Sequence, residues 1–303
     1  MASNIRRIGI LVALTAVLLF GVLLVAASYT NVGVTAGIGT EEWLLSTPDL
    51  SAVPESVVND ATVMAMELFG DYQEKYGDFT NQLLATYAEA KDKDFVVIFN
   101  SGGWGWNVPD RSPGWKSIIT GIELELDSLG YDSLLLNYQR TDENLRGVVD
   151  EFMEVIDVYP SKAENLACRV EFLTAHIPDL KVIVAGESNG TVISDGAMSI
   201  LQDNPQVYSI QTGPPFWHKS IMLDRTLVLN DNGMIPDSFS RGEIGTMAWA
   251  SLKDLIGLPQ PERESGRILF FVRAPGHDYR WQYPNVCSQI TNFMKQNFGI
   301  KPS

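Results

Sequence analysis

From residue 95 onward the chain alternates between short apolar runs and longer segments with helical spacing. The runs are nearly continuous and rich in β-branched and aromatic residues, which is typical of strands buried on both faces of a parallel sheet. They lie at 95–99, 133–138, 181–185, 207–212, 226–230 and 267–272. Strands that alternate with helices predict an α/β fold, with a mostly parallel sheet of about six to eight strands covered by helices on both faces.

The segments between the runs predict the covering helices. Helical spacing marks 115–129, 142–175, 191–201, 246–255 and a last helix at 284–298 with an apolar stripe on one side. The connection 213–225 is short and predicts no clear helix. Residues 55–90 also have helical spacing, with breaks expected at Gly70 and Gly77.

The N-terminal pattern is different. Arg6 and Arg7 precede an uncharged apolar run at 8–27, and the next charged residue is Glu41. As a helix rising ~1.5 Å per residue, this run would span about 30 Å, the thickness of a bilayer core. Positive charge on the N-terminal side predicts a single-pass anchor with a cytoplasmic N-terminus and the domain on the extracytoplasmic side.

A cleaved signal peptide is the alternative for this segment, because small residues precede Ser28, and the domain would then be secreted. The expected organisation is a cytoplasmic stub and transmembrane anchor at 1–27, a linker at 28–54, a helical preface at 55–94 and an α/β domain at 95–303. The bilayer is therefore an expected partner through residues 8–27.

Composition supports one large domain and excludes one class of partner. The chain has 303 residues, 45% of them hydrophobic, which is enough for one sizeable core. It carries 22 Lys and Arg against 37 Asp and Glu, for a net charge of −15. So acidic a surface repels phosphate backbones, so we expect no nucleic-acid partner. No protein partner is predicted.

One turn carries a candidate nucleophile. The apolar run 181–185 is followed by Gly186-Glu187-Ser188-Asn189-Gly190 and then by the predicted helix 191–201. In a strand–turn–helix of this kind the serine Oγ projects over the edge of the sheet, and side chains two residues before and after would collide. The start of the helix directs backbone N–H groups toward an oxyanion formed at Ser188.

This turn resembles the nucleophile elbow of the α/β-hydrolase superfamily of serine esterases and lipases, and the resemblance covers about residues 95–298. It implies an oxyanion hole formed by the N–H groups of Asn189 and Gly102. Asn100-Ser101 stands where the family usually has His-Gly, a departure within that loop. Three tryptophans are expected to line an apolar acyl or alcohol pocket: Trp104, Trp106 and Trp217.

The chain has three histidines as candidates for the general base. His277 follows the last apolar run, where the resemblance places the catalytic histidine. His218 follows the fourth run and could border the site, whereas His176 is expected on the wrong side of the sheet.

The resemblance places the acidic member of the triad after the fifth run. We expect Asp231 in this role, with Asp237 as the alternative. Alignment of the Ile235-Pro236 step with the family pattern instead places Asn232 at the acid's position.

These residues predict a membrane-anchored serine hydrolase that cleaves a carboxylic ester-like bond of a small-molecule or lipid-like acyl substrate through a Ser-His-Asp triad and an acyl-enzyme. No metal or organic cofactor is implied. The alternative is a catalytically inactive hydrolase-fold scaffold subunit of a membrane complex, and a peptidase or acyltransferase using the same residues is a third possibility. Cys168 and Cys287 are expected on opposite faces of the sheet, so we predict no disulfide between them.

Overall fold

The computed structural model describes residues 50–69, 73–103, 109–139, 160–259, 261, 266–269 and 272–301. The predicted anchor at 8–27, the signal-peptide alternative and the expected break at Gly70 lie outside these residues. Within the described part of the chain, no helix combines the length and the apolar character needed to cross a bilayer.

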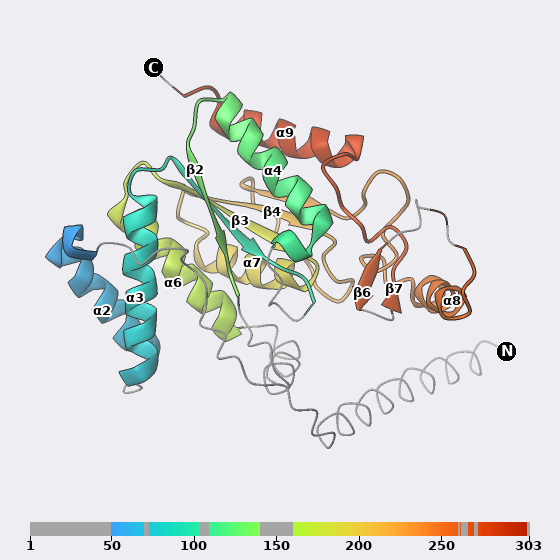
Figure 1. The fold of residues 1–303 in the computed structure, drawn as a ribbon, viewed down its shortest axis with the longest axis horizontal. Helices are drawn as coiled ribbons and strands as arrows, with labels where there is room; N and C mark the ends of the chain where they lie inside the picture. Colours follow the sequence, from blue (N-terminus) through green and yellow to red (C-terminus); the bar gives the residue numbers. More distant parts are fainter. Residues whose placement is uncertain are drawn as a thin grey trace. The chain divides into compact units, whose positions relative to one another are not determined.

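A five-stranded parallel sheet forms the centre of the fold (Figure 1). The strand order is β2-β1-β3-β4-β5, with every neighbouring pair parallel. The strands are β1 (Phe95–Asn100), β2 (Ser133–Asn137), β3 (Lys181–Glu187), β4 (Val207–Thr212) and β5 (Thr226–Leu229). The first five predicted runs are confirmed as strands, and the α/β fold class is confirmed with them.

The sixth predicted run does not extend this sheet. It forms a separate antiparallel pair, β6 (Arg267–Leu269) and β7 (Val272–Arg273). Two strands separated by two residues can pair only antiparallel, because a parallel crossover needs a dozen residues or more. The prediction of six to eight strands was therefore too high for the described sheet.

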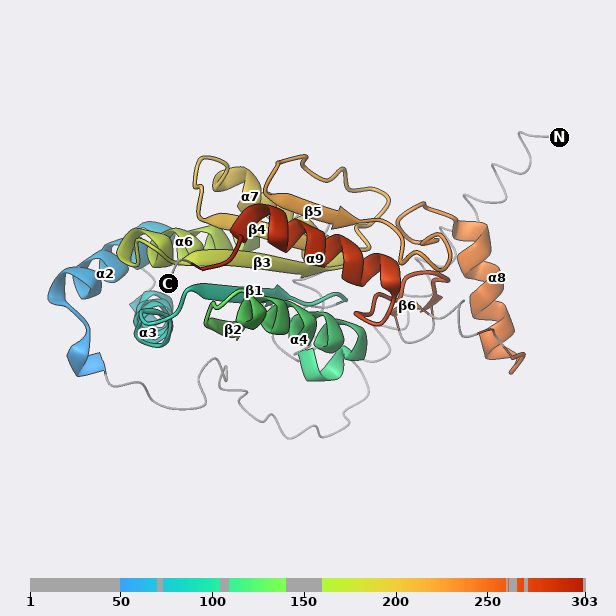
Figure 2. The same ribbon diagram turned by 90° about the horizontal axis from the view of Figure 1, so that it is seen from above.

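Helices cover both faces of the sheet (Figures 1 and 2). On one face lie α4 (Pro113–Ser128) and α9 (Pro284–Phe298), which pack against each other. The other face carries α6 (Pro160–His176) and α7 (Asn189–Ile200). The helices α2 (Glu55–Phe69) and α3 (Gln73–Ala90) pack against α6 and share its core. Two short 3₁₀ helices are also described: η1 (Leu50–Ala52), which contacts α3, and η2 (Pro109–Arg111), which contacts α4.

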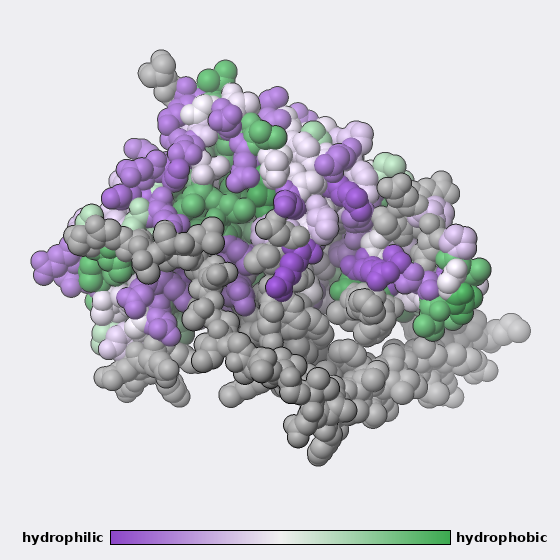
Figure 3. Space-filling view, viewed as in Figure 1, coloured by the Kyte–Doolittle hydropathy of each residue, from purple (hydrophilic) through white to green (hydrophobic). Residues whose placement is uncertain are grey.

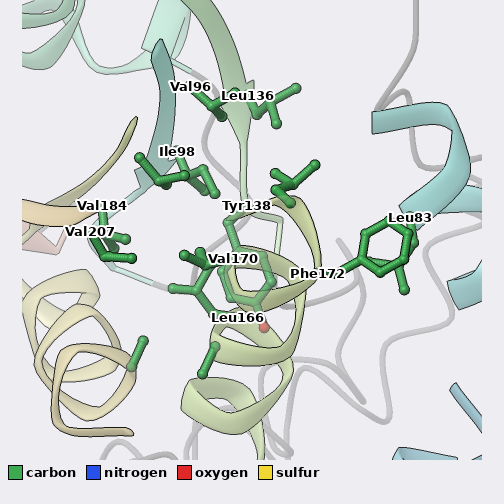
Figure 4. Close-up of a cluster of buried hydrophobic side chains, with 14 of the residues drawn as sticks. Leu83, Val96, Ile98, Leu136, Tyr138, Leu166, Val170, Phe172, Val184 and Val207 are labelled. Carbon is green, nitrogen blue, oxygen red and sulfur yellow. The ribbon is translucent and has the colours of Figure 1, made fainter. Parts of the chain in front are cut away.

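The pleat of β1 divides the core in two. Val96 and Ile98 belong to the same buried cluster as Leu166 and Val170 of α6 (Figure 4). The alternate residues of β1 face α4 and α9. Because successive side chains of a strand point to opposite faces, a strand buried on both sides must be apolar at every position. This explains why the runs in the sequence are continuous.

One expected helix break differs from the structure. Gly77 lies inside α3 and does not break it. A glycine costs a helix only about 1 kcal/mol relative to alanine, and burial of Phe79, Leu83 and Leu84 in the core outweighs that cost. Of the predicted helix 142–175, the described part is α6, which runs to His176. Residues 142–159 of the predicted helix lie outside the described residues.

The two cysteines lie on opposite faces of the sheet, as predicted. Cys168 is on α6 and packs against the core between α6 and the sheet, whereas Cys287 is on α9. Both are free thiols.

The helix α8 (Ile244–Leu255) packs beside the β6–β7 pair rather than on the main sheet. Met247 and Ala250 face inward and are buried, Met247 in a small cluster with Phe239. The outward side is apolar as well, with Trp249 and Leu255 exposed, and Figure 3 shows apolar surface over this helix.

Candidate active site

Ser188 occupies a strained turn between β3 and α7. Its backbone has φ 50° and ψ −120°, and among the described residues it is the only non-glycine with positive φ. Two backbone hydrogen bonds hold the turn: the Ser188 N–H donates to the Thr212 carbonyl at 2.9 Å, and the Thr191 N–H donates to the Ser188 carbonyl at 2.9 Å. The Thr191 hydroxyl donates to the same Ser188 carbonyl at 2.7 Å. Such strain costs about 1–3 kcal/mol and is found where a side chain must be presented to a ligand.

The two flanking glycines are required by packing, as the sequence predicts. A Cβ on Gly190 would lie 2.3 Å from the Asn100 carbonyl oxygen, and a Cβ on Gly186 would lie 2.8 Å from Ser194 Oγ. The start of α7 is therefore pressed against the end of β1. This close approach brings the loop after β1 beside Ser188.

Gly190→Ala is expected to destabilise the fold by about 3 kcal/mol or more, because the added methyl overlaps backbone atoms that cannot move aside. Gly77→Ala is the matched control. Nothing lies within 4 Å of a Cβ at Gly77, which is helical, so this change should stabilise the protein by roughly 0.5–1 kcal/mol. Urea unfolding of both variants measures the difference, and equal effects would contradict the packing explanation.

His277 lies beside the end of β4, the strand next to β3. A Cβ on Gly213 would lie 2.6 Å from His277 Cε1, so this glycine makes room for the ring. Gly213 follows Thr212, whose carbonyl accepts the Ser188 N–H. The structure thus brings His277 to the edge of the sheet that carries Ser188. Among the described residues no hydrogen bond joins Ser188 Oγ to His277, and such bonds are often long before a substrate binds.

Asp237, not the expected Asp231, contacts His277. Its Oδ2 lies 2.8 Å from His277 Nδ1, and the Asp237 side chain is fully buried. The Asp231 carboxylate instead accepts the Gly233 N–H at 2.8 Å. A local bridge between Asp231 and Pro236 closes this turn, with Asp231 at its start. Asp237, the residue after Pro236, contacts His277 Nδ1. As partner of His277 the geometry therefore favours the alternative, Asp237, over the expected Asp231.

Asp237 is held by a set of donors. Its Oδ2 accepts hydrogen bonds from Tyr279 Oη at 2.8 Å and Ser240 Oγ at 3.0 Å, and its Oδ1 accepts the Phe239 N–H at 2.8 Å. Burial alone would raise the pKa of Asp237, but the hydrogen bond from His277, the charge of His277 and the bonds from Tyr279 and Ser240 together lower that pKa. Asp237 is therefore ionised at neutral pH.

Tyr279 stays protonated beside this carboxylate. Burial, followed by the negative charge of Asp237, raises the pKa of Tyr279 well above its ordinary value. Its hydroxyl therefore acts as a permanent donor to Asp237. Position 279 carried no signal in the sequence, because a tyrosine near an apolar segment is most often a packing residue.

Tyr279→Phe is expected to lower the free energy of unfolding by about 1.5–3 kcal/mol, because it removes a hydrogen bond to a buried charge while keeping the ring. Chemical denaturation measures this effect. Tyr283→Phe, which removes a bond to the less buried Asp278, is the matched control and should cost less. An unchanged stability in Tyr279→Phe would show that this bond does not hold Asp237.

The two N–H groups expected to form the oxyanion hole differ in their hydrogen bonding. Asn189 begins α7, where N–H groups have no partner within the helix. A Cβ on Gly102 would lie 3.1 Å from Ser188 Cβ, so this loop touches the candidate nucleophile. However, the Gly102 N–H donates to the Glu187 carboxylate at 3.2 Å, and Ser112 Oγ donates to the same carboxylate at 2.9 Å. Glu187 was missed in the sequence, although it is the only charged residue within the turn motif.

The other predicted candidates are placed elsewhere. His218 Nε2 pairs with the buried Asp195 Oδ2 at 2.8 Å, and His176 Nε2 lies 3.6 Å from Asp60 on α2. Trp217 is 51% exposed and stacks edge-on against Phe239, whose ring lies 4.9 Å from that of His277. Trp104 and Trp106 lie outside the described residues.

A cavity of about 270 Å³ opens beside His277. The start of α4, the ends of β3 and β4, the start of β6, the end of β7 and the loop after β7 line it. Its charged lining residues are Glu187, Arg267, Arg273, Asp278 and Arg280. Among the described residues, no group of three or more His, Cys, Asp or Glu side chains is arranged to hold a metal ion.

The sequence matches no model of a known protein family. It is 34% identical over 94 residues to UvrABC system protein B of Agathobacter rectalis, a match that covers 30% of this chain and only 14% of that protein's length. Among solved structures, Trichoderma reesei cutinase in complex with a C11Y4 phosphonate inhibitor is similar at 14% identity and a TM-score of 0.31, over 59% of this chain and 77% of the cutinase. These similarities are too short or too distant to assign the chain to a family.

Proposed function

We propose that this protein is a serine hydrolase that cleaves carboxylic ester-like bonds through an acyl-enzyme. The observation that carries the proposal is the strained Ser188 turn next to a buried His277–Asp237 pair, at one edge of one parallel sheet. A serine hydroxyl is a weak nucleophile at neutral pH and needs a base that is itself oriented by a third group. Ser188, His277 and Asp237 are candidates for these three roles.

In the proposed reaction Ser188 Oγ attacks the carbonyl carbon while His277 Nε2 accepts the hydroxyl proton. Asp237 accepts the Nδ1–H of His277, which fixes the tautomer and stabilises the imidazolium. The C–O bond to the alcohol then breaks, and the alcohol leaves with the proton from His277. Water, deprotonated by His277, attacks the acyl-enzyme, releases the acid and restores Ser188.

The N–H groups of Asn189 and Gly102 are the proposed donors to the oxyanion. For Gly102 this requires that its N–H be released from, or shared with, the Glu187 carboxylate that accepts it in the structure. The same contact favours a second candidate function. If Glu187 keeps that donor permanently, the protein is an inactive hydrolase-fold scaffold subunit.

We further propose that residues 8–27 tether the domain to a bilayer, with the domain on the extracytoplasmic side. The support is the sequence pattern of two arginines before an uncharged run. The substrate is then a small or lipid-like acyl ester available at that side of the membrane.

Labelling with a fluorophosphonate probe tests the hydrolase against the scaffold. The probe reacts with a serine only when a base and an oxyanion hole activate it. The wild-type protein should be labelled, and Ser188→Ala should not. Absence of wild-type labelling would favour the scaffold, whereas labelling of Ser188→Ala would place the reactive serine elsewhere.

A further inference from the structure

The cavity beside His277 is lined by several arginines, although the chain as a whole is acidic. The chain carries 22 basic residues against 37 acidic ones, yet three arginines line this one cavity: Arg267, Arg273 and Arg280. Arginine presents a planar fork of N–H donors that matches carboxylate and phosphate oxygens. Two of the three have donors that the protein does not use.

Arg273 is the more buried of these two. Its Nη2 donates to Asp254 Oδ1 at 2.5 Å, but its Nε is buried without any hydrogen-bond partner. An unsatisfied donor on a buried cation is costly, and natural structures rarely leave one without a ligand or water to receive it. The side chain as a whole is 21% exposed and lines the cavity, so a ligand there can reach part of it, although Nε itself is enclosed.

In Arg280 the unused donors are the terminal nitrogens of the guanidinium rather than Nε. Its Nε bonds both carboxylate oxygens of Asp278, at 3.2 and 3.0 Å. The Arg280 guanidinium forms no other hydrogen bond within the described residues, so both terminal nitrogens remain available. The side chain is 43% exposed. A terminal pair of nitrogens is the part of a guanidinium that binds an oxyanion in bidentate fashion.

The carboxylates of the lining are already bonded. Asp278 accepts from Arg280 and from Tyr283 Oη at 2.8 Å, and Glu187 accepts from Ser112 and Gly102. Glu187 repels an anion placed near the start of α4. An incoming anion is therefore directed away from Glu187, to the arginine side of the cavity.

We infer that this cavity is a subsite for an anionic group, a carboxylate or a phosphate, bound by Arg273 and Arg280. Resting on the proposed function, this makes the substrate class an acyl ester that carries such a group. His277 lines the same cavity. Binding the anion there places the rest of the substrate along the edge that holds Ser188.

Binding to the full-length Ser188→Ala protein in detergent tests the subsite without requiring hydrolysis. Isothermal titration with inorganic phosphate and with adipate monomethyl ester should show saturable binding of at least one. The tighter of the two identifies the anionic group. Arg280→Gln in the same background should weaken that binding by about tenfold or more. Arg280→Lys should recover part of it, because it restores charge but not the fork.

Arg241→Gln is the matched control. Arg241 is exposed, follows Asp237 by four residues in the chain and does not line the cavity. It should bind as tightly as its parent. Saturable binding of neither anion, or equal loss in Arg241→Gln and Arg280→Gln, would overturn the subsite.

Kinetics then separates the subsite from the proposed function. The p-nitrophenyl half-esters of dicarboxylic acids from adipate to sebacate are compared with their methyl esters, and spontaneous cleavage is measured with Ser188→Ala. At the best chain length the wild type should prefer the anionic ester by about tenfold in kcat/KM, and Arg280→Gln should bring that ratio close to one. Hydrolysis without this preference would reject the anionic substrate class alone. Anion binding without hydrolysis would reject the hydrolase alone.

Discussion

Ser188→Ala is expected to lower kcat on an acyl ester by about 10⁴-fold or more. Without Oγ no acyl-enzyme forms, and His277 and Asp237 have no hydroxyl to activate. Groups that act as a unit lose nearly all their effect when one is removed, so the expected loss is that of the whole triad rather than one third of it.

The measurement is steady-state hydrolysis of a p-nitrophenyl acyl ester by the wild type and the variant. Ser128→Ala, at the exposed end of α4, is the matched control and should keep full activity. A far-ultraviolet circular dichroism spectrum shows whether each variant is folded. Wild-type activity retained by a folded Ser188→Ala protein would mean that the nucleophile lies elsewhere.

Asp237→Asn is expected to lower kcat by about 10³–10⁴-fold, whereas Asp231→Asn should change it little. An amide in place of the carboxylate directs His277 toward the wrong tautomer, so that Nε2 carries a proton and cannot act as the base. Asp231 bonds only its own turn, and an asparagine there can still accept the Gly233 N–H. Equal losses in the two variants would contradict the choice of Asp237 as the acid.

The same two variants should also differ in how their stability depends on pH. The pKa of Asp237 is lower in the folded protein than in the unfolded chain. The unfolded state therefore binds more protons in acid. The stabilisation from Asp237 is fully present above its unfolded pKa of ~3.9 and is lost as the pH falls through the folded pKa. Melting temperatures measured from neutral pH into acid should fall less steeply for Asp237→Asn than for Asp231→Asn.

Much of the fold could be predicted because burial constrains the residue types of each strand and helix within its own short stretch of sequence. A central strand that contacts helices on both faces must be apolar throughout, so β1 and β3 are visible as continuous runs. The apolar stripe of α9 marks its whole length for a similar reason, and its predicted bounds 284–298 are those of the structure. The run at 267–272 was misassigned because an apolar segment does not reveal its pairing partner.

Ser188 could be located from the sequence because its turn is a local constraint. Gly186 and Gly190 are needed within two residues of it, and the strand and helix on either side are adjacent in the chain. The sequence by itself therefore determined the α/β class, the first five strands, the two faces that separate Cys168 from Cys287, and the strained turn at Ser188.

The partners of that turn were decided only by tertiary structure. Asp231 and Asp237 lie in one short turn, and which of them meets His277 depends on how that turn closes against a loop forty residues further on. The contact of Glu187 with Gly102 and the gathering of three arginines beside His277 have the same origin. Hydrogen bonds and charge pairs between distant segments require particular distances and directions, and these exist only after the sheet and its loops have packed.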